Sequence, residues 1–337
     1  MTDDVPGALM SAEIAEQPDV LRRLLADGAA EVGAAVDQIR AYAPRFVVFA
    51  ARGTSDHAAL YAKYLAEIRL GLPAGLASPS SLTVYESRPD MSGVLFIAVS
   101  QSGGSPDLVD STAAARECGA LTIAVTNNPS SQLAAAAAVH VDVRAGVERA
   151  VAATKTYTAE LLALYLMLGG KAEDAAALPD AADATLAADA SAKAVERYRF
   201  AERLVTTARG YSYPTAREAA LKLMETSYLA AQAFSGADLL HGPLAMIDGG
   251  VPVIAIASPG RGGAAMAPVL DRLREVRADV LRVGVGGDLP LECNGVPEAL
   301  LPVLEILPLQ RLALQLAISR GGDPDRPRGL SKVTQTW

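Results

Sequence analysis

The chain has 337 residues, of which 51% are hydrophobic and 20% charged, and its formal net charge is −8 at pH 7. This length suggests about two domains, and the composition is that of a globular protein rather than a disordered one. The acidic balance argues against nucleic acid and membrane surfaces as partners. The two cysteines and three histidines are scattered, so we expect neither a disulfide framework nor a zinc site, and we predict no metal or other cofactor.

Nothing in the sequence directs the chain to a membrane. The first ten residues, MTDDVPGALM, are acidic and lack the apolar core of a signal peptide. No stretch approaches the roughly 18 uninterrupted apolar residues of a membrane-spanning helix. We therefore expect a cytoplasmic protein.

Short apolar strands alternate with helices along the first half of the chain. Residues 10–42 have the apolar spacing of one long helix. This alternation is typical of a parallel sheet with crossover helices. The remaining predicted elements are strands at 46–51, 94–99, 121–125 and 139–143, with helices at 54–70 and 106–118.

The pattern then recurs at a constant offset. The segment ARGTS, which begins at Ala51, is echoed by ARGYS, which begins at Ala208, and the strand residue Ile97 is echoed by Ile254. Two echoes at one offset indicate two copies of one α/β unit. We therefore predict an N-terminal helical segment (1–42), a first unit (43–170), a linker helix (171–195), a second unit (196–306), and a C-terminal helix, seen at 308–320, with its tail (307–337).

A turn rich in hydroxyl groups follows the second predicted strand of the first copy. Its sequence, SQSGGSPD (100–107), lies at the sheet edge where parallel sheets bind ligands. Backbone N–H groups and serine hydroxyls could hold a phosphate there, with Thr54 and Ser55 as further donors; the alternative is an ordinary Ser/Gly turn. The second copy has ASPGR (257–261) at this place, so we expect one composite site rather than two.

A charged stripe lies on one helix of the second copy. Glu218, Lys222 and Glu225 share a face of an otherwise apolar helix. In a cleft, Lys222 could keep one carboxylate ionised while burial raises the pKa of the other toward that of a useful base. On a solvated face the same residues would form an ordinary ion pair.

Two more side chains could carry chemistry. His241 precedes a Gly-Pro turn, where it is either a proton carrier near neutral pH or a structural turn residue. Lys332 lies close to the C-terminus and is solvated unless the tail folds over a site. A desolvated lysine could form a Schiff base with a carbonyl or stabilise an oxyanion.

Five segments, in order, resemble the double SIS (sugar isomerase) family. They are ARGTSDHAALYAKYLAE, AVSQSGGSPDLVDS, ERAVAATKTYTAELLAL, EAALKLMETSYLAAQAFSGADLLHGPLAMI and DPDRPRGLSKV. The resemblance covers about residues 40–337 and is to the isomerase half of glucosamine-6-phosphate synthase and to stand-alone SIS-type deaminases. It implies two tandem flavodoxin-like SIS units, each a parallel sheet flanked by helices on both faces, in a homodimer.

The resemblance also implies roles by position. Glu225 would move a proton between C1 and C2 of a sugar phosphate, with Glu218 and Lys222 beside it. His241, supplied by the neighbouring subunit, would open the ring, and Lys332 would react with or polarise the ketose carbonyl. Implied ligands of the 6-phosphate are Ser55, Ser100, Gln101, Ser102 and Ser105, and implied contacts of the sugar chain are Thr54 and the backbone around Val151.

The chain departs from the synthase pattern in ways that bear on its reaction. We expect no glutamine-hydrolysing domain with an N-terminal cysteine, and Gly104 and Leu240 replace a Glu and a Lys of the family pattern. We therefore expect a deaminase/isomerase that converts glucosamine 6-phosphate to fructose 6-phosphate and ammonia. The alternatives are an aldose–ketose phosphate isomerase, a fructosamine-6-phosphate deglycase, or a non-catalytic sugar-phosphate sensor.

Overall fold

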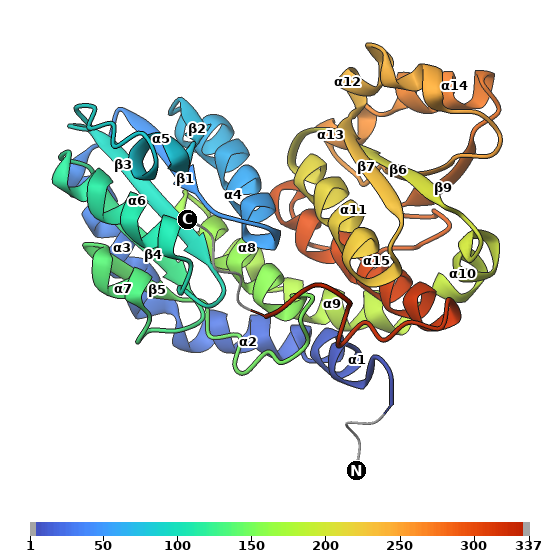
Figure 1. Ribbon diagram of the computed structural model, residues 1–337, viewed down its shortest axis with the longest axis horizontal. Coiled ribbons are helices and arrows are strands. Elements are labelled where there is room, and N and C mark those ends of the chain that lie inside the picture. The colour runs from blue at the N-terminus through green and yellow to red at the C-terminus, as the bar shows by residue number, and fades with distance from the viewer. Residues whose placement is uncertain (1–4, 333–337) are drawn as a thin grey trace. The chain divides into compact units, whose positions relative to one another are not determined.

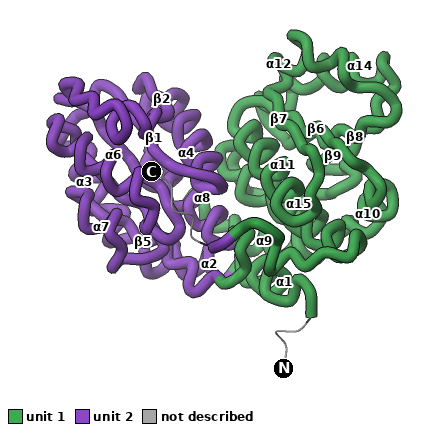
Figure 2. Tube along the Cα trace, in the orientation of Figure 1, with its two compact units in different colours: residues 1–18, 149–154, 174–330 green, residues 19–148, 155–173, 331–337 purple. Residues whose placement is uncertain are grey.

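The computed structural model describes residues 5–332 of the chain, which form two compact units (Figures 1 and 2). Unit 2 holds most of the first half of the chain and unit 1 most of the second half. Short segments depart from this order: the N-terminal residues and the segment 149–154 belong to unit 1. The described ranges are 5–18, 149–154 and 174–330 for unit 1, and 19–148, 155–173 and 331–332 for unit 2.

Unit 2 is built on a five-stranded parallel sheet with the strand order β2-β1-β3-β4-β5. The central strand β3 is almost wholly buried, which explains its unbroken apolar sequence. Four of these strands are confirmed to within one residue at each end, whereas β2, a short edge strand, was not predicted. The strands are β1 (Phe46–Ala50), β2 (Ala74–Leu76), β3 (Val94–Ser100), β4 (Leu121–Thr126) and β5 (Val139–Asp142).

Helices cover both faces of this sheet (Figure 1). Helices α3, α4 and α8 pack together on one face, and α5, α6 and α7 lie on the other. The apolar core on the second face includes Leu82, Phe96, Leu108 and Leu133. The helices are α3 (Ala29–Tyr42), α4 (Thr54–Leu65) with a π-helical extension (Ala66–Leu70), α5 (Pro79–Thr83), α6 (Pro106–Glu117), α7 (Gln132–Ala136) and α8 (Lys155–Met167).

The prediction of a single helix over residues 10–42 is wrong. The segment forms three helices, α1 (Ala8–Ala15), α2 (Gln17–Asp27) and α3. Pro18 lacks an N–H and can occupy only the first turn of a helix, so it starts α2 rather than continuing α1. Gly28 then separates α2 from α3.

Unit 1 repeats the plan of unit 2 with one strand fewer. Its four-stranded parallel sheet has the order β7-β6-β8-β9, in which β6 and β8 stand where β1 and β3 stand in unit 2. The sequence echo is therefore confirmed as a structural repeat, and so is the predicted architecture of two helix-flanked parallel sheets. The strands are β6 (Arg203–Ala208), β7 (Ala230–Ser235), β8 (Pro252–Ile256) and β9 (Asp279–Val283).

The helices of unit 1 again lie on both sheet faces. Helix α11 packs on β6 and β7 and against α15, while α12 and α14 contribute Leu239, Val269 and Leu273 to the core on the other face. The helices are α9 (Leu178–Ala187), α10 (Ser191–Tyr198), α11 (Tyr213–Ser227), α12 (Gly236–Leu240), α13 (Arg261–Ala264), α14 (Ala267–Glu275) and α15 (Leu301–Ser319).

Helix α15 is unusually apolar. With the turn before it, the stretch Glu298–Ser319 is long and apolar enough to cross a membrane by length and composition, but 83% of its apolar 18-residue window is buried inside the protein. It packs against α9, α10 and α11. This burial is that of a core helix, and the helix begins at Leu301 rather than at 308 as predicted.

Candidate functional site

The predicted site residues fall in both units. Unit 2 contains Lys332 and the predicted phosphate ligands, and unit 1 contains Val151, His241 and the acid–lysine stripe, which is Glu218, Lys222 and Glu225. Each group has its own local geometry, which follows from the elements that carry it.

The hydroxyl loop, residues 100–105, joins β3 to α6. The N–H of Gly103 donates to Ser100 Oγ at 3.2 Å, and the N–H of Gly104 donates to Ser102 Oγ at 3.3 Å. Gly103 has φ 62, and a Cβ there would lie 2.3 Å from Ser131 Oγ, so only glycine fits this turn. The loop leads into the N-terminus of a 12-residue helix, whose partial positive charge favours an anion.

Arg52 provides a cation beside this loop that the sequence reasoning missed. Its Nε and Nη2 donate to Asp107 Oδ2 at 3.0 and 2.5 Å, and Ser105 Oγ donates to the other oxygen of the same carboxylate at 2.9 Å. The Arg52 side chain is 47% exposed, whereas that of Asp107 is buried. A guanidinium group therefore lies beside the hydroxyls of this loop.

Ser55 has a carboxylate partner of its own. Its hydroxyl donates to Glu160 Oε1 at 2.8 Å, and both residues are buried. Ser212, which stands at the same place of the repeat in unit 1, donates to Glu305 Oε1 at the same distance. The serine–glutamate pair is therefore part of the repeated core, and phosphate binding by Ser55 stays a prediction.

The acid–lysine stripe is a buried group on α11. Lys222 Nζ lies 3.3 Å from Glu218 Oε1 and 2.5 Å from Glu225 Oε2. The side chains of Glu218 and Lys222 are 0% and 1% exposed and that of Glu225 is 21% exposed, which excludes the solvated ion pair considered above. Burial alone lowers the pKa of Lys222, but the two carboxylates outweigh it and raise the pKa, so the lysine stays charged. Glu225 is the member that reaches solvent.

His241 ends α12, and its backbone N–H donates to the carbonyl of Asp238 at 3.0 Å. Its imidazole is exposed and makes no hydrogen bond with any residue of the described range 5–332. The ring is therefore not tied down as a structural turn residue within this chain. Val151, half-buried, lies in the short segment between β5 and α8 that belongs to unit 1.

Lys332 is not a solvated terminal lysine. Its Nζ lies 3.1 Å from Glu148 Oε2, and its side chain is 25% exposed while that of Glu148 is 0% exposed. Glu148 also accepts hydrogen bonds from the N–H and hydroxyl of Thr156. Sequence reasoning missed Glu148, although it begins one of the segments that carry the resemblance. An ammonium group held in this way can polarise a carbonyl or stabilise an oxyanion.

The second copy of the hydroxyl loop is closed by the chain itself. Glu298 Oε1 accepts the N–H of Gly262 at 2.7 Å. A Cβ on Gly260 would lie 2.3 Å from the carboxyl carbon of the same glutamate, so the carboxylate is seated directly on this loop. An anion is thus already supplied where unit 2 has the serines 100, 102 and 105.

Glu305 couples the stability of unit 1 to pH. Burial raises its pKa to about 6 against the lowering effect of neighbouring hydroxyls, Ser258 and Ser212 foremost. Because this pKa lies above the usual 4.5, the folded state favours the protonated form. The associated stability is present below pH 4.5 and is lost as the pH rises through 6.

We therefore expect Glu305→Gln, which cannot ionise, to gain stability relative to the wild type as the pH rises through this range, with the gain in the free energy of unfolding approaching about 2 kcal/mol well above pH 6. Urea unfolding at a series of pH values measures this difference, with Glu196→Gln on the exposed surface as a control. A difference that does not change with pH would contradict the assignment.

The described residues contain no group of three or more His, Cys, Asp or Glu side chains arranged to hold a metal ion.

Comparison with known proteins relates this geometry to a family. The SIS domain model matches residues 42–169 and 198–281. The glutamine–fructose-6-phosphate aminotransferases (isomerizing) of Symbiobacterium thermophilum and Gloeobacter violaceus are 36% and 34% identical over 96% of the chain. The chain spans 58% of the length of each of these relatives.

Solved structures agree with this assignment. A Silicibacter pomeroyi protein provisionally assigned as a phosphosugar isomerase superposes with a TM-score of 0.85 at 34% identity, covering 95% of this chain and 100% of that one. The C-terminal domain of glucosamine–fructose-6-phosphate aminotransferase from Francisella tularensis gives a TM-score of 0.80 at 26% identity, covering 94% and 97%. Glucosamine-6-phosphate deaminase from Thermotoga maritima, at 23% identity and a TM-score of 0.76 over 97% and 99%, shares the fold. The chain is a member of the SIS domain family.

Proposed function

We propose that this protein is an enzyme that converts glucosamine 6-phosphate and water to fructose 6-phosphate and ammonia. Family membership and the relatives that act on fructose 6-phosphate support a phosphosugar substrate. The chain spans little more than half the length of those relatives, so we do not assign their glutamine-dependent reaction to this protein. The observation that carries the proposal is the buried Lys222, which holds a partly exposed Glu225 in place.

In the proposed reaction, Glu225 takes the proton from C2 of the open-chain aldose and returns it to C1. The amino-enol formed in between becomes a ketose imine, and water then releases ammonia. Lys222 keeps Glu225 anchored on α11 at 2.5 Å, so the carboxylate needs little reorganisation in either step. A base placed in this way typically contributes about 10²–10⁴ in rate.

The other groups have supporting roles in this proposal. The hydroxyl loop binds the 6-phosphate, with the Arg52 guanidinium beside it, and phosphate binding fixes the open chain for proton transfer. Lys332, positioned by Glu148, stabilises negative charge on the oxygen of the reacting carbon. His241, with its exposed ring, opens the sugar ring; the family resemblance suggests that it serves the neighbouring subunit of a homodimer.

A pure aldose–ketose phosphate isomerase is the second candidate. It is favoured by the similarity to the Silicibacter pomeroyi protein, which covers all of that chain. The same base would serve both reactions, because each begins with removal of the proton at C2. The two candidates differ in whether the nitrogen leaves.

An NMR time course with glucosamine 6-phosphate in deuterated water tests the proposal. We expect fructose 6-phosphate with deuterium at C1, together with an equal amount of ammonia, because the proton passes through an exchangeable carboxyl group. Turnover of glucose 6-phosphate to a C1-deuterated ketose, without ammonia from the amino sugar, would favour the isomerase. If both sugar phosphates bind but no carbon exchanges its proton, the protein is a sugar-phosphate sensor and the proposed enzyme activity is rejected.

A further inference from the structure

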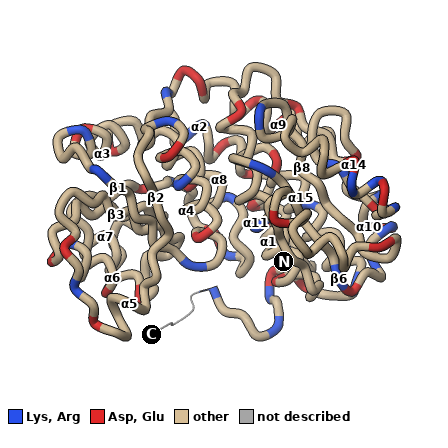
Figure 3. Tube along the Cα trace, turned by 90° about the horizontal axis from the view of Figure 1, so that it is seen from above, with Lys and Arg blue, Asp and Glu red and all other residues tan. Residues whose placement is uncertain are grey.

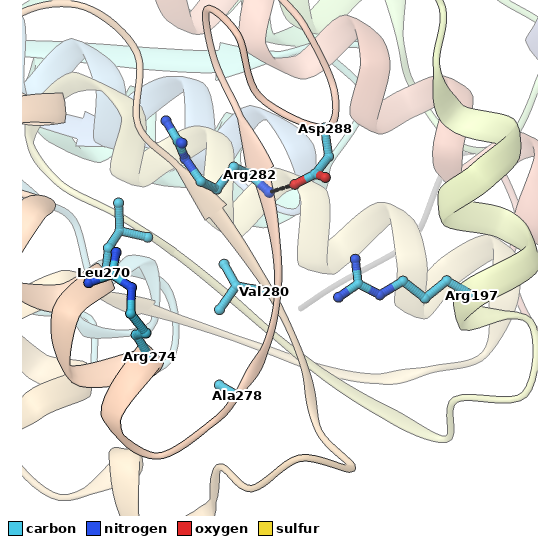
Figure 4. A pocket seen from close by; sticks show the side chains of 7 residues that line it. All are labelled: Arg197, Leu270, Arg274, Ala278, Val280, Arg282 and Asp288. Carbon is cyan, nitrogen blue, oxygen red and sulfur yellow. Dashed lines mark hydrogen bonds between the residues drawn. The ribbon is translucent and has the colours of Figure 1, made fainter.

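A pocket of about 350 Å³ opens in unit 1 away from all residues assigned above (Figure 4). This volume lies in the range of small-molecule sites, about 300–1,000 Å³. We call it the arginine pocket. Its lining residues are the apolar Leu270, Ala278 and Val280 and the charged Arg197, Arg274, Arg282 and Asp288.

Side chains from helix α14 and strand β9 line much of this pocket. Leu270 and Arg274 are four residues apart on α14 and so share one helix face. Val280 and Arg282 are two apart on β9, the edge strand of the sheet, and so share one sheet face. Each element therefore places one apolar residue and one arginine on the same face. Arg197 of α10 extends toward Val280 from the other side (Figure 4).

The charge of the lining is positive in a chain whose net charge is −8. Asp288 does not neutralise the Arg282 guanidinium, because its carboxylate accepts the backbone N–H of that residue at 2.8 Å. The guanidinium of Arg282 makes no ion pair or hydrogen bond with any residue from 5 to 332. Basic and acidic segments alternate along α10 and α14 (Figure 3), but within the pocket the arginines prevail.

The other two arginines have partners that a ligand can displace or share. Arg274 pairs with Asp271 at 2.6 Å, and both side chains are well exposed, so this pair contributes little. Arg197 pairs with Asp279, which does not line the pocket. The guanidinium groups of the three arginines that line the pocket suit a diphosphate, because each can bind phosphate oxygens with paired hydrogen bonds.

We propose that the arginine pocket binds a nucleoside diphosphate. The apolar side chains of Leu270, Ala278 and Val280 give the flat face of a base a surface to pack against. The arginines bind the phosphates, and the carboxylate of Asp288 is the group available to ribose hydroxyls. This site is independent of the reaction proposed above.

Calorimetric titration of the full chain with ADP and with UDP, and separately with pyrophosphate and with adenosine, tests the proposal. We expect at least one nucleotide to bind at one site per chain, more tightly than pyrophosphate or adenosine, because phosphates and base both contribute. The proposal is wrong if neither ADP nor UDP binds, or if pyrophosphate binds as tightly as the nucleotides.

Two variants locate the binding. Arg282→Ala and Arg274→Ala should each weaken nucleotide binding about tenfold, the loss expected for one charge-assisted hydrogen bond. Arg272→Ala is the matched control, because Arg272 lies on the same helix but pairs with Glu275 outside the pocket. Thermal melts confirm that each variant is folded. Nucleotide binding that is unchanged in both pocket variants would place the ligand elsewhere and reject the proposal.

Discussion

Glu225→Gln should lower kcat with glucosamine 6-phosphate by about 10²–10⁴ while leaving substrate binding nearly unchanged. Glutamine keeps the shape of the side chain, and its oxygen can still accept a hydrogen bond from Lys222, now 2.5 Å from the carboxylate. It cannot take up the C2 proton. Steady-state kinetics, together with calorimetric binding of the substrate, measure the two effects separately.

Glu202→Gln is the matched control for this variant, since Glu202 is an exposed glutamate of the same unit outside α11. The control should retain normal kcat and KM. Near-normal turnover by Glu225→Gln would remove Glu225 from its role as base. A large rise in KM at unchanged kcat would make it a binding residue instead.

Lys222→Met is expected to lower the free energy of unfolding by about 3–5 kcal/mol, the usual effect of removing one partner from a buried ion pair. The reason is the burial of Glu218, whose side chain is 0% exposed and would lose its nearby cation. Glu225, at 21% exposure, can instead turn toward water. Urea unfolding followed by circular dichroism measures the loss.

The double variant Glu218→Gln/Lys222→Met separates charge from packing. It removes both buried charges and keeps side chains of similar volume, so we expect it to recover most of the stability lost by the single variant. A loss below about 1 kcal/mol in the single variant, or no recovery in the double variant, would show that the pair is not electrostatically coupled.

Local sequence patterns were enough to find most of the sheet of unit 2 and the acid–lysine stripe of unit 1. A strand buried on both faces must be apolar throughout, which is why β1 and β3 could be read from runs of Val, Ile and Phe. The helical period alone placed Glu218, Lys222 and Glu225 on one face. In unit 1 the sequence reading found only β8, through its echo of β3, and missed β6, β7 and β9. In unit 2 it missed β2, which has only three residues.

The partners of the candidate site residues could not be predicted in the same way. Glu148 and Lys332 are 184 residues apart, and Ser55 and Glu160 are 105 apart. Arg52 and Asp107 meet because β1 and β3 are neighbours in the sheet and end at the same edge. The periodicity of a short stretch of sequence cannot predict contacts between residues so far apart in the chain.

The sequence by itself determined the apolar strands and the spacing of the acid–lysine stripe, because these depend on residues within one or two turns of each other. It also showed the repeated α/β plan, because two short segments recur at one constant offset. Tertiary structure decided that Lys222 and Glu218 are buried, that Glu148 holds Lys332, and that Glu298 closes the second loop. Those outcomes depend on which distant elements pack together. Side-chain burial and pairing at long range are properties of that packing and not of any local pattern.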